Sequence, residues 1–102
     1  MAGLLKPDAA TILIGSIRKK YPDLVIHVHT HDTAGTGAYS MVKCIEAGAD
    51  IIDGAIDCMA NSNSQPALGT FDSLFGEKSG IINDKKLYTQ INDYWIQTRK
   101  LY

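Results

Sequence analysis

Two hydrophobic periods alternate along the chain. Apolar residues recur every three to four positions, the spacing of one helix face, in residues 7–20, 38–47, 66–75 and 84–95. Aliphatic and β-branched runs at 24–31 and 51–56 are typical of strands, and the second is apolar enough to be buried on both faces of a sheet. Because a helix lies between the two strands, the pattern predicts an α/β fold with a parallel sheet.

Local signals mark where the predicted helices begin and end. Pro7 suits a first helical position, where its missing N–H would have no partner, and Pro22 stops the same helix. Gly48 is the expected C-terminal stop of the second helix. We expect Pro66 to open the third helix and Asp84 to cap a C-terminal helix. The segments between these signals are predicted to be loops.

Histidines dominate the end of the first predicted strand. Side chains alternate between the faces of a strand, so His27, His29 and His31 share one face and Val28 lies on the other. Neutral imidazole is the commonest metal ligand, and histidines at i and i+2 can reach one ion where the strand opens into a loop. The carboxylate of Asp32, next to them, can orient an imidazole by accepting a hydrogen bond from the ring nitrogen that does not bind the metal. The pattern predicts a metal site; the alternative is structural histidines with satisfied hydrogen bonds.

A phosphate-binding loop is another use for the glycines that follow. Gly35 and Gly37 precede the second predicted helix, and helix N-termini bind anions. The third glycine of the dinucleotide motif is absent, because Ser40 stands five residues after Gly35. The sequence therefore favours the metal site.

Composition limits the classes of function. The 102 residues allow one domain at most, and 45% hydrophobic with 21% charged residues is typical of a globular protein. A net charge of −1 leaves no electrostatic footprint for nucleic acid or an anionic membrane, and the basic run 18–20 suits a helix C-terminus. No apolar run approaches the roughly 18 residues of a membrane span. Cys44 and Cys58 lack the spacing of a disulfide framework or a zinc knuckle.

These motifs carry a resemblance to a known family. The string HVHTHDTAGTG at 27–37, with MAGLLKP at 1–7 and Ser-Gln-Pro at 64–66, resembles the carboxyltransferase domains of pyruvate carboxylases. The similarity extends to Tyr94-Trp95 and residues 99–102, and so covers essentially the whole chain. Related decarboxylases and transcarboxylases usually lack the Asp after the last His and have Gly-His-Pro instead of Ser-Gln-Pro. Hydroxymethylglutaryl-CoA lyases read His-Cys-His-Asp, so this chain follows the carboxylases at each point.

The resemblance implies a fold and an activity. The family's domain is a (β/α)8 barrel, so the chain is expected to be a partial TIM barrel, its C-terminal half only, with a C-terminal helix. That domain transfers a carboxyl group from carboxybiotin to pyruvate, giving oxaloacetate. It holds a divalent ion through an Asp, a carboxylated lysine and two histidines, which match His29 and His31 but not His27. A mixed nitrogen and oxygen ligand set suits Zn²⁺ or Mn²⁺.

Neighbouring residues are expected to support this site. Those in its loops are Asp32, Thr33, Gly35 and Gly37, followed in a substrate loop by Ser64 and Gln65. At least one of the two glycines is expected to have a positive φ or to let the backbone pass close to the substrate. His27 is expected to be a barrel-interior residue whose main need is a hydrogen bond.

Much of the family's machinery has no counterpart in residues 1–102. The metal-binding Asp, the carboxylated lysine, the substrate-binding arginine and the proton-relaying threonine are absent, and a complete barrel needs about 250 residues. In the family, Lys-Asp directly precedes the string that here begins at Met1. A truncated product, inactive or nearly so alone, is therefore expected. The alternatives are a noncatalytic metal-binding or interaction module, or a fragment of a biotin-dependent oxaloacetate decarboxylase or lyase.

The resemblance also implies partners. Biotin is expected to be carried covalently on another domain, and ATP to act only at a separate domain. Pyruvate, carboxybiotin, the rest of the barrel and the biotin-carrier domain are the expected partners, in a full-length protein that forms a homo-oligomer. No nucleic acid or membrane partner is expected. The expected compartment is the cytoplasm or the mitochondrial matrix.

Overall fold

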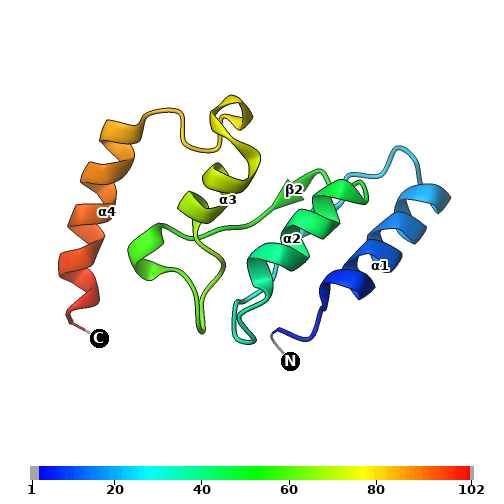
Figure 1. Cartoon of the computed structure of the whole chain (residues 1–102), viewed down its shortest axis with the longest axis horizontal. Helices are drawn as coiled ribbons and strands as arrows, with labels where there is room; N and C mark the ends of the chain where they lie inside the picture. The colour runs from blue at the N-terminus through cyan, green and yellow to red at the C-terminus, as the bar shows by residue number, and fades with distance from the viewer. Residues whose placement is uncertain (1–2, 102) are drawn as a thin grey trace.

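The structure, a computed structural model, describes residues 3–101 as helices laid beside a short parallel sheet (Figure 1). In chain order the elements are α1 (Pro7–Lys20), β1 (His27–Val28), α2 (Gly37–Glu46), β2 (Ile51–Ile52), η1 (Asp57–Met59), α3 (Leu68–Phe75), η2 (Glu77–Ser79) and α4 (Lys85–Arg99). The alternation of strands and helices confirms the predicted α/β pattern. Met1 and Ala2, which begin the predicted N-terminal loop, lie outside the described residues.

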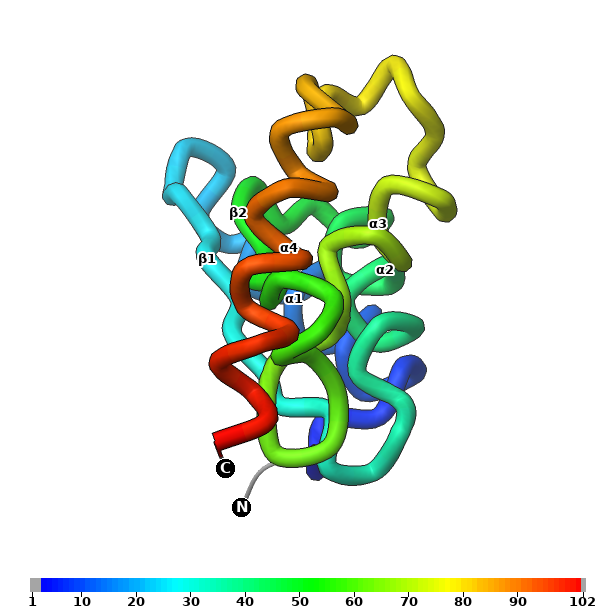
Figure 2. Tube along the Cα trace, turned by 90° about the vertical axis from the view of Figure 1, so that its left-hand side faces the viewer, coloured from blue at the N-terminus to red at the C-terminus, as the bar shows by residue number. Residues whose placement is uncertain are grey.

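The two strands pair in parallel, as the sequence predicts. His27 lies opposite Ile51 in the register, and Figure 2 shows β1 and β2 side by side. A single parallel bridge between Ala55 and Ala67 brings a third extended segment next to the continuation of β2. Parallel segments point the same way, so the loops that follow them emerge at one end of the sheet.

The regular strands are shorter than the predicted runs 24–31 and 51–56. The ladder between β1 and β2 covers only His27–Val28 and Ile51–Ile52, and within the described residues β1 has a neighbour on one side only. The prediction that the second strand is buried on both faces is wrong for this chain. Ile51 is 45% exposed, since no described element covers its face of the sheet.

Helix boundaries follow the sequence signals with one exception. α1 begins at Pro7, and the Asp84 carboxylate caps α4 by accepting a 2.9 Å hydrogen bond from the Leu87 N–H. Gly48, just after α2, has a φ of 116°, which favours glycine. α3 begins at Leu68 rather than Pro66, because the residue between them is still paired to the extended segment after β2.

The core lies between the helices and one face of β1. Its members are Ala10, Ile14, Ile26, Val28, Met41, Cys44, Ala49 and Phe71. α1 and α2 lie side by side in Figure 1 and contribute four of these residues. Burying each large aliphatic side chain contributes roughly 1.5–3 kcal/mol, so this cluster is the main force that holds β1 against the helices.

A polar clamp fixes the start of both strands. The Arg18 guanidinium donates to the Gly48 carbonyl at 2.6 Å and to the Asp50 carboxylate at 2.6 Å. The same carboxylate accepts from the Ile26 N–H at 2.9 Å. The Ile26 amide first, and then Arg18, hold the pKa of Asp50 below its usual range. The clamp therefore ties the end of α1 to the sheet register.

Polar contacts attach α4 to η1. The Tyr88 hydroxyl donates to the Asp57 carboxylate at 2.8 Å, and Asn92 accepts from the Cys58 N–H at 2.9 Å. Partial burial and the bond to Asp57 raise the pKa of Tyr88 to about 12. The predicted apolar face of α4, which includes Trp95, stays largely exposed. No helix among residues 3–101 has the length and apolar character to cross a bilayer.

Candidate metal centre

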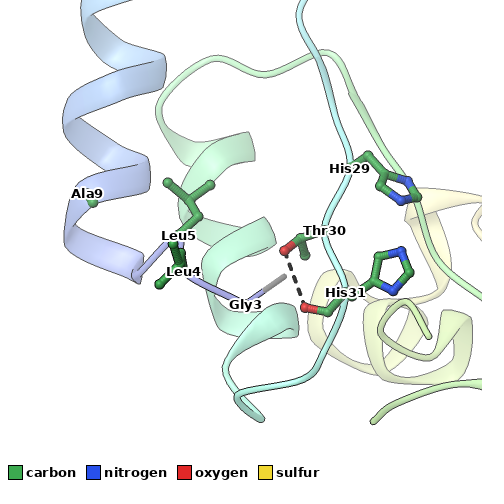
Figure 3. A pocket seen from close by; sticks show the side chains of 7 residues that line it. All are labelled: Gly3, Leu4, Leu5, Ala9, His29, Thr30 and His31. Atoms are coloured by element: carbon green, nitrogen blue, oxygen red, sulfur yellow. Dashed lines mark hydrogen bonds between the residues drawn. The ribbon is translucent and has the colours of Figure 1, made fainter. Parts of the chain in front are cut away.

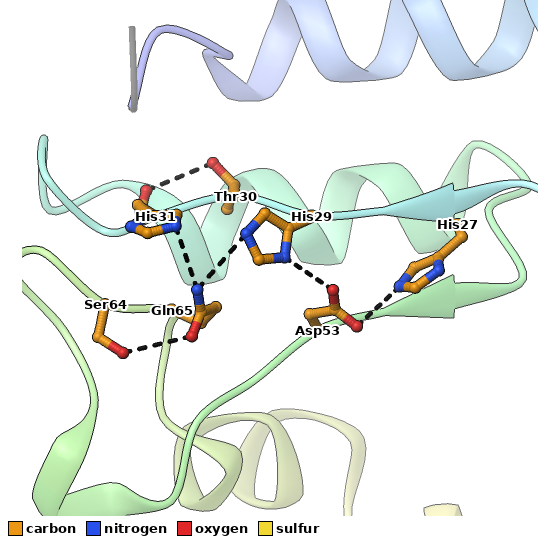
Figure 4. Close-up of polar contacts among 7 residues, drawn as sticks. All are labelled: His27, His29, Thr30, His31, Asp53, Ser64 and Gln65. Atoms are coloured by element: carbon orange, nitrogen blue, oxygen red, sulfur yellow. Dashed lines mark hydrogen bonds and ion pairs between the residues drawn. The ribbon is translucent and has the colours of Figure 1, made fainter.

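The histidines lie on the open face of β1 and its extension. Ile26, Val28 and Thr30 are buried toward the helices, whereas the side chains of His27 and His29 are 52% and 53% exposed. This alternation confirms the prediction that the imidazoles share one face. Figure 4 shows the three rings along the strand, with polar side chains of later segments facing them.

Asp53 bridges two of the imidazoles. Its Oδ1 lies 2.7 Å from His27 Nε2, and its Oδ2 lies 2.8 Å from His29 Nδ1. These hydrogen bonds, the one to His27 first, hold the pKa of Asp53 below its usual range. The parallel register explains the contact, because it brings the residue after β2 beside the residue after β1. A carboxylate acts only as an acceptor, so the bridging nitrogen of each ring carries the proton.

His31 is held in the same way by a backbone group. Its Nδ1 donates to the carbonyl of Asn63, in the loop before α3. In a neutral imidazole the other nitrogen is then an acceptor, so His29 and His31 both present the Nε2 lone pair. Metal-binding histidines are commonly fixed by a hydrogen bond at the far ring nitrogen. His27 uses Nε2 for Asp53 and is oriented differently.

The two free lone pairs face one side chain. Gln65 Nε2 lies 3.2 Å from His31 Nε2 and 3.5 Å from His29 Nε2, while its Oε1 accepts from Ser64 Oγ at 3.3 Å (Figure 4). The amide must present its NH₂ group here, because its oxygen would face two acceptors. The ring centroids are 5.2 Å apart. Both imidazoles are therefore directed at one point.

This donor set fits part of a metal site. Two neutral imidazoles with fixed Nδ1 protons are a suitable pair of ligands for a borderline divalent ion. Among residues 3–101 no group of three or more His, Cys, Asp or Glu side chains is arranged to hold such an ion. His29 and His31 would therefore supply two of the ligands of such an ion.

A strained turn presents the loop groups to the histidines. Asn61 and Ser62 have φ values of 69° and 54°, a left-handed conformation that is uncommon for residues other than glycine. The Asp32 N–H donates to the Ser64 carbonyl at 2.8 Å, which ties this turn to the end of the histidine segment. Backbone strain of this kind clusters at functional sites.

The glycine loop has the geometry that was expected. Gly35 has a φ of 74°, and a Cβ at Gly37 would lie 2.8 Å from Asp32 Oδ1 and 2.9 Å from Pro66 Cγ. The positive φ expected of at least one glycine is therefore present at Gly35, whereas the close approach at Gly37 is to Asp32 and Pro66, and approach to a substrate stays a prediction. Asp32 Oδ1 accepts from the Gly37 N–H at 2.8 Å, so its observed contact is with the loop and not with an imidazole. Thr33 is exposed beside it.

The same contact weakens the phosphate-loop alternative. The first N–H of α2 is taken by the carboxylate of Asp32, so the chain itself supplies the anion at this helix N-terminus. Ser40 is almost fully buried, and its hydroxyl donates to the Leu5 carbonyl at 2.7 Å. These groups are therefore satisfied internally.

A cleft of about 480 Å³ lies on the other side of the histidine segment. Figure 3 shows Leu4 and Leu5 facing Thr30 across it, while the rings of His29 and His31 point away. The Thr30 hydroxyl is bonded to the His31 carbonyl at 3.3 Å. The cleft is thus mainly apolar, and the reactive groups converge on the opposite face.

Sequence reasoning missed two of these groups. Asp53 follows two isoleucines, and a carboxylate at the end of an apolar strand was an available signal. The Asn63 carbonyl could not be found this way, because a backbone acceptor leaves no trace in the residue type. Gln65 was identified as a loop residue, but its contact with both imidazoles was not.

Structural comparison defines the class. The chain matches the carboxyltransferase domain of Rhizobium etli pyruvate carboxylase with pyruvate, with a TM-score of 0.83 and 38% identity over 97% of this chain and 17% of that one. A variant of the R. etli enzyme crystallised without acetyl coenzyme A gives a TM-score of 0.84 and 40% identity, over 97% and 10% of the two chains. The chain is a mixed helix and strand segment that corresponds to part of a carboxyltransferase domain.

Sequence comparison gives relatives with the same name. Over 100% of this chain, pyruvate carboxylase of Aspergillus terreus is 49% identical, pyruvate carboxylase 1 of Caenorhabditis elegans 49%, and the mitochondrial enzyme of Rattus norvegicus 42%. No family model matches the chain. The chain is a homologue of pyruvate carboxylase and spans 9% of the length of each of these relatives.

Proposed function

We propose that this chain is the part of a pyruvate carboxylase carboxyltransferase domain that supplies His29 and His31 to a divalent metal ion. The observation that carries the proposal is the convergence of two Nε2 lone pairs while each Nδ1 is held from behind. The site also lies where parallel strands end, the position at which TIM-barrel enzymes place their chemistry. We therefore place residues 1–102 in the C-terminal half of a (β/α)8 barrel.

The chain's own residues prepare these ligands. Asp53 and the Asn63 carbonyl fix the Nδ1 protons, which leaves the Nε2 lone pairs available and raises their basicity. A bound Zn²⁺ or Mn²⁺ would polarise the oxygens of pyruvate and ease the loss of a methyl proton. In the proposal, Asp32, Thr33, Gly35 and Gly37 shape the loop beside the site, and Ser64 with Gln65 contributes to a substrate loop.

The proposal extends to the partners of the whole protein. Pyruvate and carboxybiotin are the substrates, with biotin attached to a carrier domain and ATP used at a separate domain. The rest of the barrel supplies the remaining metal ligands, and the assembled protein is a homo-oligomer. The compartment is the mitochondrial matrix or the cytoplasm; the rat and mouse relatives are mitochondrial.

A domain graft tests the metal assignment. In this graft, residues 1–102 replace the corresponding segment of the Rhizobium etli carboxyltransferase domain, which supplies the other strands. His31→Ala removes one of few ligands, so metal affinity should fall by more than the roughly 10- to 100-fold that losing a ligand's hydrogen-bond partner costs, and metal content and oxaloacetate formation should fall with it. Metal analysis of the purified protein and a carboxylation assay measure the two effects.

His27→Gln is the matched control for that change. Its Nε2 bonds only Asp53 among the described residues, and a glutamine amide can donate the same bond. Metal content should stay close to that of the unmodified graft. Full metal content after His31→Ala would contradict the assignment. A graft that decarboxylates oxaloacetate but does not carboxylate pyruvate would favour the decarboxylase alternative.

A further inference from the structure

The Gln65 amide occupies the point that the metal proposal assigns to an ion. It donates toward His31 at 3.2 Å and toward His29 at 3.5 Å, and its only other side-chain partner among the described residues is Ser64. An ion bound to both Nε2 atoms would need the lone pairs that this NH₂ group now faces. The amide and the ion therefore compete.

The amide is not needed to orient the rings. His29 is fixed by Asp53, and His31 by the Asn63 carbonyl, through their other nitrogens. Both bonds are independent of Gln65 and are shorter than either contact that the amide makes. Removing the amide would leave the same tautomers and the same convergence, and it would remove a competing donor.

We infer that Gln65 is a metal-displaceable placeholder, which satisfies the two imidazoles in the metal-free site and must withdraw before an ion enters. The inference rests on the proposed function, because it takes His29 and His31 as the ligands. It assigns Gln65 a role in setting the affinity and rate of metal uptake. A merely structural glutamine would affect folding but would not be displaced by metal.

The test is metal titration of the domain graft with Gln65→Leu, which keeps a side chain of similar size, removes the donor and adds no metal-ligating atom. Zn²⁺ or Mn²⁺ should bind about two- to tenfold more tightly than to the unmodified graft, the factor equivalent to one net hydrogen bond. Uptake from a chelator should also be faster. Gln90→Leu, at an exposed position on α4, is the matched control and should change neither quantity.

Nuclear magnetic resonance of the metal-free graft gives a second readout. The side-chain NH₂ signal that disappears in Gln65→Leu should shift when Zn²⁺ is added, whereas the Gln90 signal should not. Imidazole ¹⁵N shifts should report the Nδ1–H tautomer with and without the glutamine. Gln65→Ala serves in the same assays if the leucine variant does not fold.

The outcomes separate the two proposals. Unchanged or weaker metal binding in Gln65→Leu, or a Gln65 NH₂ signal that does not shift with Zn²⁺, would overturn the placeholder inference. If His31→Ala still abolishes metal binding in that case, the proposed function stands without it. If His31→Ala retains the metal, both are wrong.

Discussion

Single residues at the loop after β1 decide how closely two segments approach. At position 35 glycine is favoured by the backbone angle alone, because a Cβ there would meet nothing within 4 Å. At position 37 glycine is favoured by the lack of space, because a Cβ would collide with Asp32 and Pro66. The two glycines are therefore required for different physical reasons.

Alanine substitutions separate these reasons. Gly35→Ala should cost about 1–2 kcal/mol, the penalty of a left-handed backbone for a residue with a Cβ. Gly37→Ala should cost about 1–3 kcal/mol through overpacking and should also weaken metal binding more, because it pushes Asp32 and Pro66 away from the segments that carry the site. Urea unfolding and metal titration of the graft measure both. Equal losses of metal affinity would contradict this account.

For single residues, the sequence predicted which side chains share a face but not which groups they contact. The shared face of His27, His29 and His31 follows from the two-residue period of a strand, which needs no tertiary information. The bridge from Asp53 and the amide of Gln65 depend on the parallel register and on a turn 30 residues later in the chain, so residue types alone could not place them.

Among the elements, the clamp at the start of the sheet sets the register that brings Asp53 to the histidines. Arg18 on α1, Asp50 before β2 and Ile26 before β1 meet in one set of hydrogen bonds. Helices and their ends were predictable from proline, glycine and capping signals. Strand lengths were not, because pairing requires a neighbour, and β1 has one on a single side within the described residues.

Asp50→Asn tests the clamp through its pH dependence. Because the folded chain lowers the pKa of Asp50, the ionised carboxylate stabilises the fold above the unfolded value, and this contribution is lost as pH falls through the lowered pKa. The variant should melt at a lower temperature than the parent at pH 7. The gap should begin to shrink below about pH 4, where the carboxylate is protonated in the unfolded chain, and should close below the lowered pKa, where it is protonated in both states.

Asp93→Asn is the control, since the described residues offer its carboxylate no hydrogen-bond donor. Thermal melts of the graft across this pH range should show no comparable gap for the control. A gap for Asp50→Asn that persists unchanged at acid pH would mean that the stabilisation does not come from the charge.

The whole molecule is a thin slab. Its extents are 45 × 31 × 19 Å, and the shortest corresponds to one layer of helices and one sheet, since stacked layers lie about 10 Å apart. Exposed apolar residues are spread over the slab, among them Ile12 on α1, Ile51 on the sheet and Tyr94 on α4. The sheet is covered by helices on one face only.

The isolated 102-residue chain should therefore self-associate. Each buried aliphatic side chain contributes roughly 1.5–3 kcal/mol, whereas ordering the backbone costs roughly 1–2 kcal/mol per residue, so a half-covered core leaves little net stability. Size-exclusion chromatography should show aggregates or higher assemblies, and an apolar dye should bind. A monodisperse 11.1 kDa monomer with a sharp two-state melt would show that the slab is self-sufficient.

Buried and exposed positions alternate along residues 26–31, so the even-numbered and odd-numbered residues of this segment have different roles. Ile26 and Val28 belong to the core and Thr30 faces the cleft beside Leu4 and Leu5, while the imidazole nitrogens of His29 and His31 bond groups on the other face. A protein engineer could thus redesign the inner residues for tighter packing and leave the ligands untouched. Packing thus constrains the inner residues and hydrogen bonding constrains the histidines, although both sets share one short stretch of backbone.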